Sequence, residues 1–259
     1  MTLQTQLVFM SYNVRYANEA DGRNTWTLRR GLVFDVINRR RPDVLGVQEA
    51  LASQIDELLV HLPGYAFVGV GRDDGERKGE FSAIFYRRDS LRIIESGTYW
   101  LSETPETPGS KHWGNNVVRI CTWARMQQSD GAEFLVSNVH FDHESAPSRL
   151  KSSELVSRRG AAGVVMGDFN AGEQSPEVTY IKDKGWVDTF RAIHAEKTEV
   201  GTFNGFDPLA TKGEKIDYIF VPSNWKVVDA GIDRTVFDGR SPSDHFPVWA
   251  RVELPPRMP

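Results

Sequence analysis

The chain has 259 residues, enough to bury a large hydrophobic core, and its apolar, charged and aromatic fractions are those of an ordinary globular protein. Its 31 basic and 35 acidic residues give a formal net charge of −4, which argues against a nonspecific DNA-binding protein but leaves room for a local basic cleft. Cys121 is the only cysteine, so an internal disulfide and a thiolate zinc site are excluded. We expect one domain over residues 1–259, because no linker-like stretch divides the chain.

Targeting signals are not evident in the sequence. Residues 1–10 lack the basic start and the long apolar core of a signal peptide, and no segment approaches the length of a membrane span. We therefore expect a cytoplasmic protein, or a secreted one if a leader precedes this sequence. A monomer is the expected oligomeric state.

The first part of the chain alternates strands with helices. Residues 7–13 read as a buried strand, and residues 26–40 carry apolar side chains at helical spacing. Residues 44–47 form a second predicted strand, and residues 55–62 a second amphipathic helix.

The middle of the chain is richer in strands. Two long segments, residues 71–79 and 102–116, contain glycine or proline and read as loops, which at such lengths are often functional. Residues 128–131 form a good hairpin turn. The predicted strands cover residues 66–70, 81–86, 91–95, 117–127 and 133–139.

The last part returns to mixed elements. Helices are predicted over residues 146–159 and 176–184, and strands over residues 164–166, 215–221, 225–236 and 247–252. Many strands, few helices, and both hairpin and crossover connections together predict an α/β protein with two packed sheets and helices outside them.

A pair of polar side chains follows the strand that ends at Gly167. Asp168 and Asn170 stand two apart, so in extended chain they point to the same side. A carboxylate can bind a cation or take a proton from water, and a carboxamide can hold water or a phosphoryl oxygen. Taken alone, such a pair is more often a turn or a helix cap.

Similar polar residues recur at other predicted strand ends. Asp217 lies within an apolar strand, where a carboxylate needs a partner, and a histidine is a natural one. Each residue alone could be a turn former, a helix cap or a surface histidine. Together they predict one site at a shared edge, formed by Asn13, Glu49, His140, Asp168, Asn170, Asp217, Asp244 and His245.

The order of these motifs resembles the endonuclease/exonuclease/phosphatase superfamily across residues 12–249. The resemblance implies a four-layer α/β sandwich, with two packed mixed sheets and helices on the outer faces. It also implies hydrolysis of phosphate esters with Mg²⁺, for which Mn²⁺ could substitute. The motifs are Ser11-Tyr12-Asn13-Val14-Arg15, Gly46-Val47-Gln48-Glu49, Asn138-Val139-His140, Gly167-Asp168-Phe169-Asn170, Ile216-Asp217-Tyr218 and Ser243-Asp244-His245.

Carried over residue by residue, the resemblance implies a metal side to the site. Glu49 would be the principal ligand, with Asn13 beside it and Asp244 in support. Magnesium prefers oxygen ligands and keeps several waters, so one carboxylate with one carboxamide is sufficient.

The resemblance also implies a catalytic side. Asp168 would orient or deprotonate the attacking water, and Asn170 would hold water or a phosphoryl oxygen. His245, supported by Asp217, would stabilise developing phosphoryl charge, and His140 would contact the same phosphate. Which residue acts as the base is left open.

Several residues are candidates for substrate binding. Arg15 stands where abasic-site repair endonucleases usually carry an acid, which weighs against a repair function. Glu80 and Arg119 match weaker positions near the nuclease site. His112 and Trp113 could line a pocket for a phosphate that bears a ring or a sugar, or could simply pack in the fold.

We expect a metal-dependent phosphodiesterase or phosphatase acting on a small or medium-sized phosphate ester. A nuclease is the alternative among enzymes, with nucleic acid a possible but less favoured partner. A catalytically silent binding module with the same fold is the alternative from another class. The presence of all the principal polar residues disfavours it.

Overall fold

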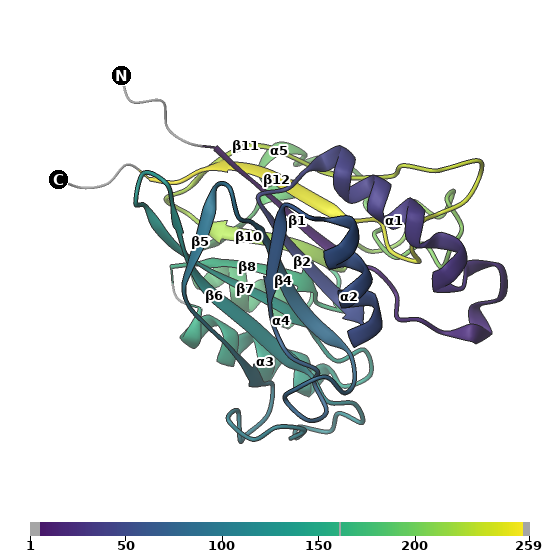
Figure 1. Ribbon diagram of the computed structural model, residues 1–259. Coiled ribbons are helices and arrows are strands. Elements are labelled where there is room, and N and C mark those ends of the chain that lie inside the picture. The colour runs from purple at the N-terminus through teal and green to yellow at the C-terminus, as the bar shows by residue number, and fades with distance from the viewer. Residues whose placement is uncertain (1–5, 161, 256–259) are drawn as a thin grey trace.

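Two mixed β-sheets packed face to face form the centre of the molecule in residues 6–160 and 162–255, which the computed structural model describes (Figure 1). The first sheet has the strand order β11-β12-β1-β2-β4-β3. Its strands are β1 (Gln6–Asn13), β2 (Val44–Ala50), β3 (Tyr65–Val68), β4 (Phe81–Arg87), β11 (Lys226–Ile232) and β12 (Val248–Glu253).

The second sheet also has six strands, in the order β5-β6-β7-β8-β10-β9. It is built mostly from the middle of the chain, as the teal and green colours in Figure 1 show. Its strands are β5 (Leu91–Trp100), β6 (Ile120–Gln128), β7 (Glu133–His140), β8 (Val164–Asp168), β9 (Trp186–Asp188) and β10 (Asp217–Pro222).

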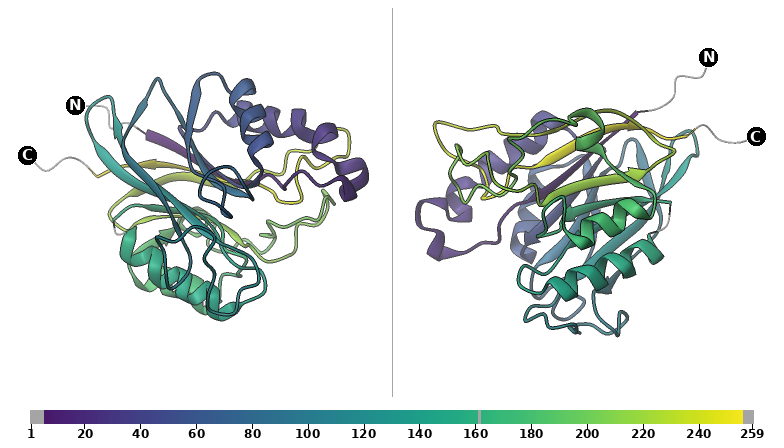
Figure 2. Two further views of the ribbon diagram at one scale, coloured as in Figure 1. Left: turned by 60° about the horizontal axis from the view of Figure 1, so that its bottom comes forward. Right: turned by 180° about the vertical axis from the view of Figure 1, so that it is seen from behind.

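Helices cover the outer faces of the sheets (Figure 2). One core cluster joins helices α1 and α2 to the first sheet, and another joins α3 and α4 to the second. This arrangement confirms the predicted four-layer α/β sandwich. Within the described residues, no helix has the length and apolar character needed to cross a membrane. The helices are α1 (Trp26–Arg40), α2 (Ala52–His61), α3 (Ala146–Arg159), α4 (Pro176–Asp183), α5 (Thr189–Ile193) and the 3-10 helix η1 (Glu19–Asn24).

The central strands are apolar on both faces because both faces are covered. Phe9 of β1 points into the core between the sheets, where its ring meets that of Phe134 edge-on at 5.9 Å. Its neighbour Met10 points the other way, into the core under α1 and α2. In β8, Met166 likewise points into the core between the sheets, and Val165 points into the core under α3 and α4. Strands buried on two sides read as continuous apolar runs, which is how the sequence presents them.

The predicted helices and strands are present, but several begin or end at other residues than predicted. The strand predicted over 91–95 continues to Trp100, and the one predicted over 117–127 begins at Ile120. Three short elements, η1, β9 and α5, were not predicted. With three to six residues each, they are too short to show a helical or strand period.

The sheet topology places six chain segments at one edge of the molecule. Strand β1 runs parallel to β2, and β7 runs parallel to β8, so their carboxyl ends point the same way. Strands β12 and β10 run antiparallel to β1 and β8, so the beginnings of β12 and β10 lie at that same edge. The polar residues at the ends of β1, β2, β7 and β8, at the start of β10 and just before β12 are therefore brought together.

A buried polar bridge holds the two sheets close near this edge. The amide of Asn138 in β7 donates to the carbonyl oxygens of Val47, at 3.0 Å, and Ala83, at 2.8 Å, in the first sheet. Gly46 makes the approach possible, because a Cβ there would lie 2.7 Å from Asn138 Oδ1. The relative position of the two sheets at this edge is therefore fixed by hydrogen bonds as well as by packing.

Candidate active site

A cavity of about 450 Å³ opens at the edge where these strand ends meet. It is lined by most of the residues that the sequence predicts for the site. Two others, Asn13 and Asp217, are buried and hydrogen-bonded to side chains that line the cavity. The predicted residues in its lining are Arg15, Glu49, Glu80, Arg119, His140, Asp168, Asn170, Asp244 and His245.

Asn13 connects the two sides of the cavity. Its amide nitrogen donates to Glu49 Oε1 and to Asp168 Oδ2, each at 3.0 Å, so it bridges the first sheet and the second. Its amide oxygen accepts from the backbone N–H of Arg15 at 3.0 Å. In this orientation Asn13 presents hydrogens to both carboxylates and positions them relative to each other.

Glu49 is aimed into the cavity by an irregularity in β2. The pairing of β2 with β4 shifts register between Gln48 and Ala50, and Glu49 has a φ of 66°. A bulge of this kind redirects a side chain and is common beside functional sites. The Glu49 side chain is 14% exposed, and Oε2 accepts from the backbone N–H of Tyr16 at 3.2 Å.

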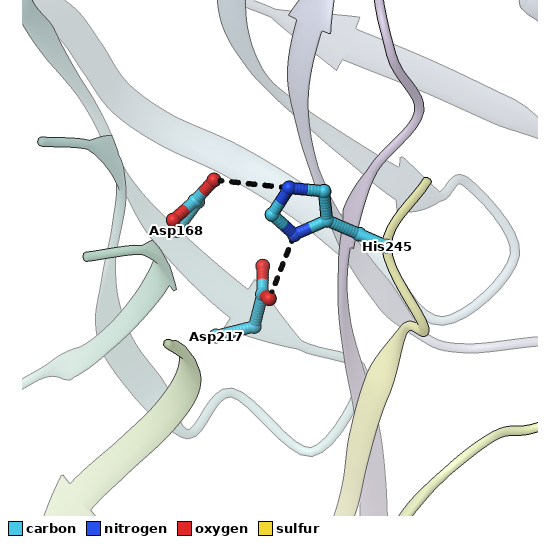
Figure 3. A group of neighbouring side chains, drawn as sticks. All are labelled: Asp168, Asp217 and His245. Atoms are coloured by element: carbon cyan, nitrogen blue, oxygen red, sulfur yellow. Dashed lines mark hydrogen bonds and ion pairs between the residues drawn. The ribbon is translucent and has the colours of Figure 1, made fainter. Parts of the chain in front are cut away.

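Asp168, Asp217 and His245 form a second group (Figure 3). The hydrogen bond from Asn13 to Asp168 joins this group to Glu49. Nδ1 of His245 lies 2.9 Å from Asp217 Oδ2, and Nε2 lies 3.7 Å from Asp168 Oδ2. The imidazole thus stands between two buried carboxylates. Asp217 has the histidine partner that its position in an apolar strand requires.

The two carboxylates make His245 a cation. Burial alone would lower the pKa of His245, but the charges of Asp217 and Asp168 outweigh burial and raise that pKa well above its ordinary value. For Asp168 itself, burial together with the nearby charge of Asp217 raises the pKa to about 7. An imidazolium beside a carboxyl that titrates near neutrality is a combination suited to acid–base chemistry.

We expect the metal-free protein to lose stability as the pH rises from about 4 to about 7. Because the pKa of Asp168 is raised from 3.8 to about 7, the folded protein holds a proton that the unfolded chain releases at lower pH. Stability from this group is therefore lost as the pH rises towards 7. Melting temperatures in EDTA should fall less steeply for Asp168→Asn than for the wild type, and parallel curves would contradict the expectation.

His140 is held in one tautomer by Arg119. Nη1 of Arg119 donates to His140 Nδ1 at 3.0 Å, and Nη2 donates to His143 Nδ1 at 2.9 Å. Since an arginine cannot accept a hydrogen bond, Nδ1 of His140 must be the acceptor and Nε2 must carry the proton. Burial, reinforced by the Arg119 charge, lowers the pKa of His140 well below its usual value. The ring is a neutral donor 3.6 Å from Asp168 Oδ2.

Arg15 occupies the acidic corner of the cavity. Its guanidinium pairs with Asp21 at 3.0 Å and lies 3.9 Å from Glu49 and 3.7 Å from Asp244. The backbone of Arg15 is left-handed, with a φ of 56°, and its guanidinium lies over the ring of Tyr16. The arginine that replaces an acid of the repair enzymes therefore adds positive charge beside both Glu49 and Asp244.

Arg29 supports this corner, and it is not among the predicted site residues. The residue is fully buried in α1, on the same helical face as Val33 and Val36, and this placement of an arginine is the signal that could have revealed it. Its guanidinium ties the exit of β1 to the segment before Asp244. It donates to the carbonyl oxygens of Val14 at 2.6 Å, Arg15 at 2.7 Å, Asn24 at 2.9 Å and Pro242 at 3.2 Å.

Replacing Arg29 by methionine should lower the free energy of unfolding by roughly 3 kcal/mol, because several buried carbonyl oxygens lose their donor. Arg30→Met is the matched control, since Arg30 is on the same helix with a side chain 44% exposed, paired with Glu57. We expect a loss below about 1 kcal/mol there. Urea unfolding measures both changes, and similar values for the two variants would refute this role of Arg29.

Two predicted substrate contacts lie elsewhere. His112 and Trp113 do not line the cavity. Nδ1 of His112 accepts from the backbone N–H of Glu103 at 3.3 Å, and Trp113 packs on the core cluster under α3 and α4. Both residues are thus used within the fold. Other residues of the cavity lining were absent from the predicted site, namely Tyr16, Arg72, Val117, His143, Phe203 and Ile216.

The residues present fit a divalent cation on the Glu49 side. Glu49 is partly exposed to the cavity, and Asp244 lies on the same side, where burial raises its pKa and the charge of Glu49 adds to this effect. A cation would relieve that crowding of negative charge. Asp168, Asp217 and His245 also offer ligand atoms within 4.8 Å of one another. A metal ligand needs a free imidazole lone pair, however, and a protonated His245 has none.

The chain is similar in sequence and in structure to known proteins. The Endonuclease/Exonuclease/phosphatase family matches residues 10–245. A solved structure of a family protein from Bacteroides thetaiotaomicron is 36% identical, has a TM-score of 0.91, and matches over 96% of this chain and 98% of that one. A mannosyl-6-phosphatase of the same bacterium is also 36% identical, with a TM-score of 0.90 and coverage of 96% and 100%.

Viral relatives are more distant. An uncharacterised protein of Acanthamoeba polyphaga mimivirus is 26% identical over 165 residues, which is 58% of this chain and 60% of that protein. A second protein of this virus is 25% identical, and the match covers 30% of its length. The chain therefore spans less than two thirds of these relatives. The family match and the two bacterial structures show that the chain belongs to the endonuclease/exonuclease/phosphatase family.

Proposed function

We propose that the protein is a magnesium-dependent hydrolase of phosphate esters, active on a small substrate. Members of its family hydrolyse phosphate esters. The observation that carries the proposal is the pairing of two charged centres across one cavity. Imidazolium His245, backed by Asp217, lines the same cavity as Glu49, and Asn13 links the two sides through Asp168.

The phosphoryl group would bind between these centres. Phosphate esters repel anionic nucleophiles, so catalysis requires positive charge at the phosphoryl oxygens. His245 supplies such a charge, and the neutral Nε2–H of His140 supplies a further donor. A divalent cation held by Glu49 with Asp244 would polarise a phosphoryl oxygen and stabilise the leaving oxygen.

The attacking water would be held by Asp168 and Asn170. The amide nitrogen of Asn170 donates to the carbonyl oxygen of Phe141 at 3.0 Å, which leaves its amide oxygen to accept from water. The backbone N–H of Asn170 donates to Asp168 Oδ1 at 2.9 Å and fixes the carboxylate beside it. With a pKa near 7, Asp168 can take the proton of the water as the water attacks phosphorus in line.

The cavity favours a small ester over a nucleic acid. Its volume is about 450 Å³, and its lining carries Arg15, Arg72 and Arg119 interspersed with four carboxylates, so it is not uniformly basic. The mannosyl-6-phosphatase neighbour supports a sugar phosphate as the substrate class. We infer that the leaving group is a polyol or sugar and that the transferred group is a terminal phosphate.

A substrate panel tests this proposal. Purified protein with Mg²⁺ would be assayed on bis-p-nitrophenyl phosphate, p-nitrophenyl phosphate, hexose 6-phosphates, phospholipid headgroups and supercoiled plasmid. We expect hydrolysis of small esters, highest for sugar phosphates, and loss of activity in Glu49→Ala and His245→Ala. Plasmid nicking faster than ester hydrolysis would favour the nuclease, and no hydrolysis of any substrate would favour the silent binding module.

Arg15→Ala is expected to raise KM about tenfold, because the variant loses one charge-assisted hydrogen bond to the substrate phosphate. Binding of Mn²⁺ should be unchanged or tighter, because the variant removes a positive charge 3.9 Å from Glu49. Steady-state kinetics and Mn²⁺ binding followed by electron paramagnetic resonance separate the two effects. Exposed Arg23→Ala is the matched control, and an equal loss of substrate and metal affinity in Arg15→Ala would contradict this assignment.

A further inference from the structure

A second pocket, of about 250 Å³, lies on the outer face of β5, β6 and β7, beside the end of α3. It shares no residue with the catalytic cavity, and no step of the proposed reaction uses it. We call it the sheet pocket, defined by Tyr99 and Ser137 at its floor, Trp123 and Arg159 at its walls, and Glu95 and Arg125 at its rim.

The floor of the sheet pocket holds two hydroxyls that lack good partners. Tyr99 is 2% exposed and Ser137 is 1% exposed, and neither hydroxyl bonds to an oxygen or nitrogen atom of the described residues. Their polar neighbour is the buried thiol of Cys121, which is a weak hydrogen-bonding group. Both hydroxyl oxygens are buried beneath the pocket, so contacts to a bound ligand would come from the walls and the rim.

The rim carries charges of both signs that the protein leaves unpaired. Glu95 and Arg125 face each other across β5 and β6, yet in the described chain neither makes a side-chain hydrogen bond or ion pair. Arg159 differs, because it pairs with Glu106 at 2.6 Å and lies over the Tyr99 ring. A carboxylate and a guanidinium presented side by side can together bind groups that both donate and accept hydrogen bonds.

One wall of the sheet pocket is aromatic, and a glycine beneath it leaves the space that the ring occupies. The indole of Trp123 lies against Gly97, where a Cβ would come within 3.0 Å of Nε1. Its N–H has no acceptor among the described residues. Trp123 therefore offers an apolar surface and a free donor to the same small volume, as aromatic residues in polar binding sites commonly do.

We propose that the sheet pocket binds a single ring of a neutral carbohydrate. An anion would meet the Glu95 carboxylate, and a cation would meet two guanidinium groups, whereas hydroxyls can donate to Glu95 and accept from Arg125. The C–H face of a sugar ring packs against an indole. A volume of about 250 Å³ corresponds to roughly eight water molecules, which suits one ring better than a chain of them.

The test follows the indole N–H of Trp123 by nuclear magnetic resonance, with Trp123→Phe identifying its peak. Methyl α-D-glucopyranoside, methyl α-D-mannopyranoside and methyl β-D-galactopyranoside would each be titrated to 50 mM. At least one glycoside should shift the peak in a saturable manner, and Arg125→Ala should raise its Kd at least fivefold. Arg251→Ala, an exposed arginine on a strand of the other sheet, is the matched control and should leave the Kd unchanged.

Three results would overturn the proposal: no saturable shift with any glycoside, a shift produced by acetate or ethylammonium instead, or an unchanged Kd in Arg125→Ala. The measurement needs no catalysis, so it stands apart from the proposed hydrolase function. Hydrolysis of p-nitrophenyl phosphate should be the same in Trp123→Phe, Arg125→Ala and the wild type, whatever that activity is. A loss of hydrolysis in the two variants would instead link these residues to the catalytic cavity.

Discussion

Replacing His245 by glutamine should lower kcat on a small phosphate ester by about 10³-fold. Glutamine keeps a hydrogen-bond donor near the cavity but cannot carry the positive charge that Asp217 and Asp168 maintain on the imidazole. The lost effect is electrostatic stabilisation of the phosphoryl group as charge develops on it. Steady-state kinetics with saturating Mg²⁺ would measure the loss, while KM should change little.

A control and a double variant sharpen this expectation. His61 lies on α2, stacked on Phe34 and outside the cavity, so His61→Gln should retain wild-type kinetics. Asp217→Asn added to His245→Gln should cause little further loss, because Asp217 acts through the imidazole. If the two substitutions multiplied their effects, Asp217 would have a role of its own and the pairing would not explain catalysis.

Replacing Glu49 by glutamine should remove most activity, again about 10³-fold, together with divalent-cation affinity. Glutamine matches the shape of glutamate and can still accept from the Asn13 amide, so the change removes one negative charge with little repacking. Binding of Mn²⁺ should weaken by at least tenfold. Raising the Mg²⁺ concentration should restore part of the rate if weakened metal binding is the cause.

Glu57→Gln provides the matched comparison for Glu49→Gln. Glu57 is on the helix that follows β2, partly exposed, and paired with Arg30. It should leave both activity and Mn²⁺ binding unchanged. Normal Mn²⁺ binding in Glu49→Gln with activity lost would show that Glu49 acts on the substrate and not on the cation.

The fold and the convergence of the site could be predicted because strand ends are visible in a sequence. Asp168, His140 and Glu49 each follow an apolar run, and parallel strands bring such ends to one edge. The order of motifs then identified the family, which the family match confirms, and its sandwich, which the sheet arrangement confirms. The extents of the strands were less predictable, since pairing partners decide where a strand ends.

The side-chain orientations could not be read from the sequence. The direction of the Asn13 amide depends on two carboxylates that lie 36 and 155 residues away along the chain. The position of Arg29 on the apolar face of α1 indicates that it is buried, but the carbonyl oxygens that it binds are known only from the structure. His112 and Trp113 are in a long loop with polar and aromatic residues, a composition that does not distinguish a binding loop from one that packs on its own core.

Catalysis as proposed requires a cation bound by Glu49, opposite the charged pair of His245 and Asp217. Crystals soaked in Mn²⁺ and measured at the manganese absorption edge would locate the metal directly. We predict an anomalous peak within coordination distance of a Glu49 carboxylate oxygen. A peak bound instead by Asp168, Asp217 and His245, with none at Glu49, would contradict this assignment of the metal site.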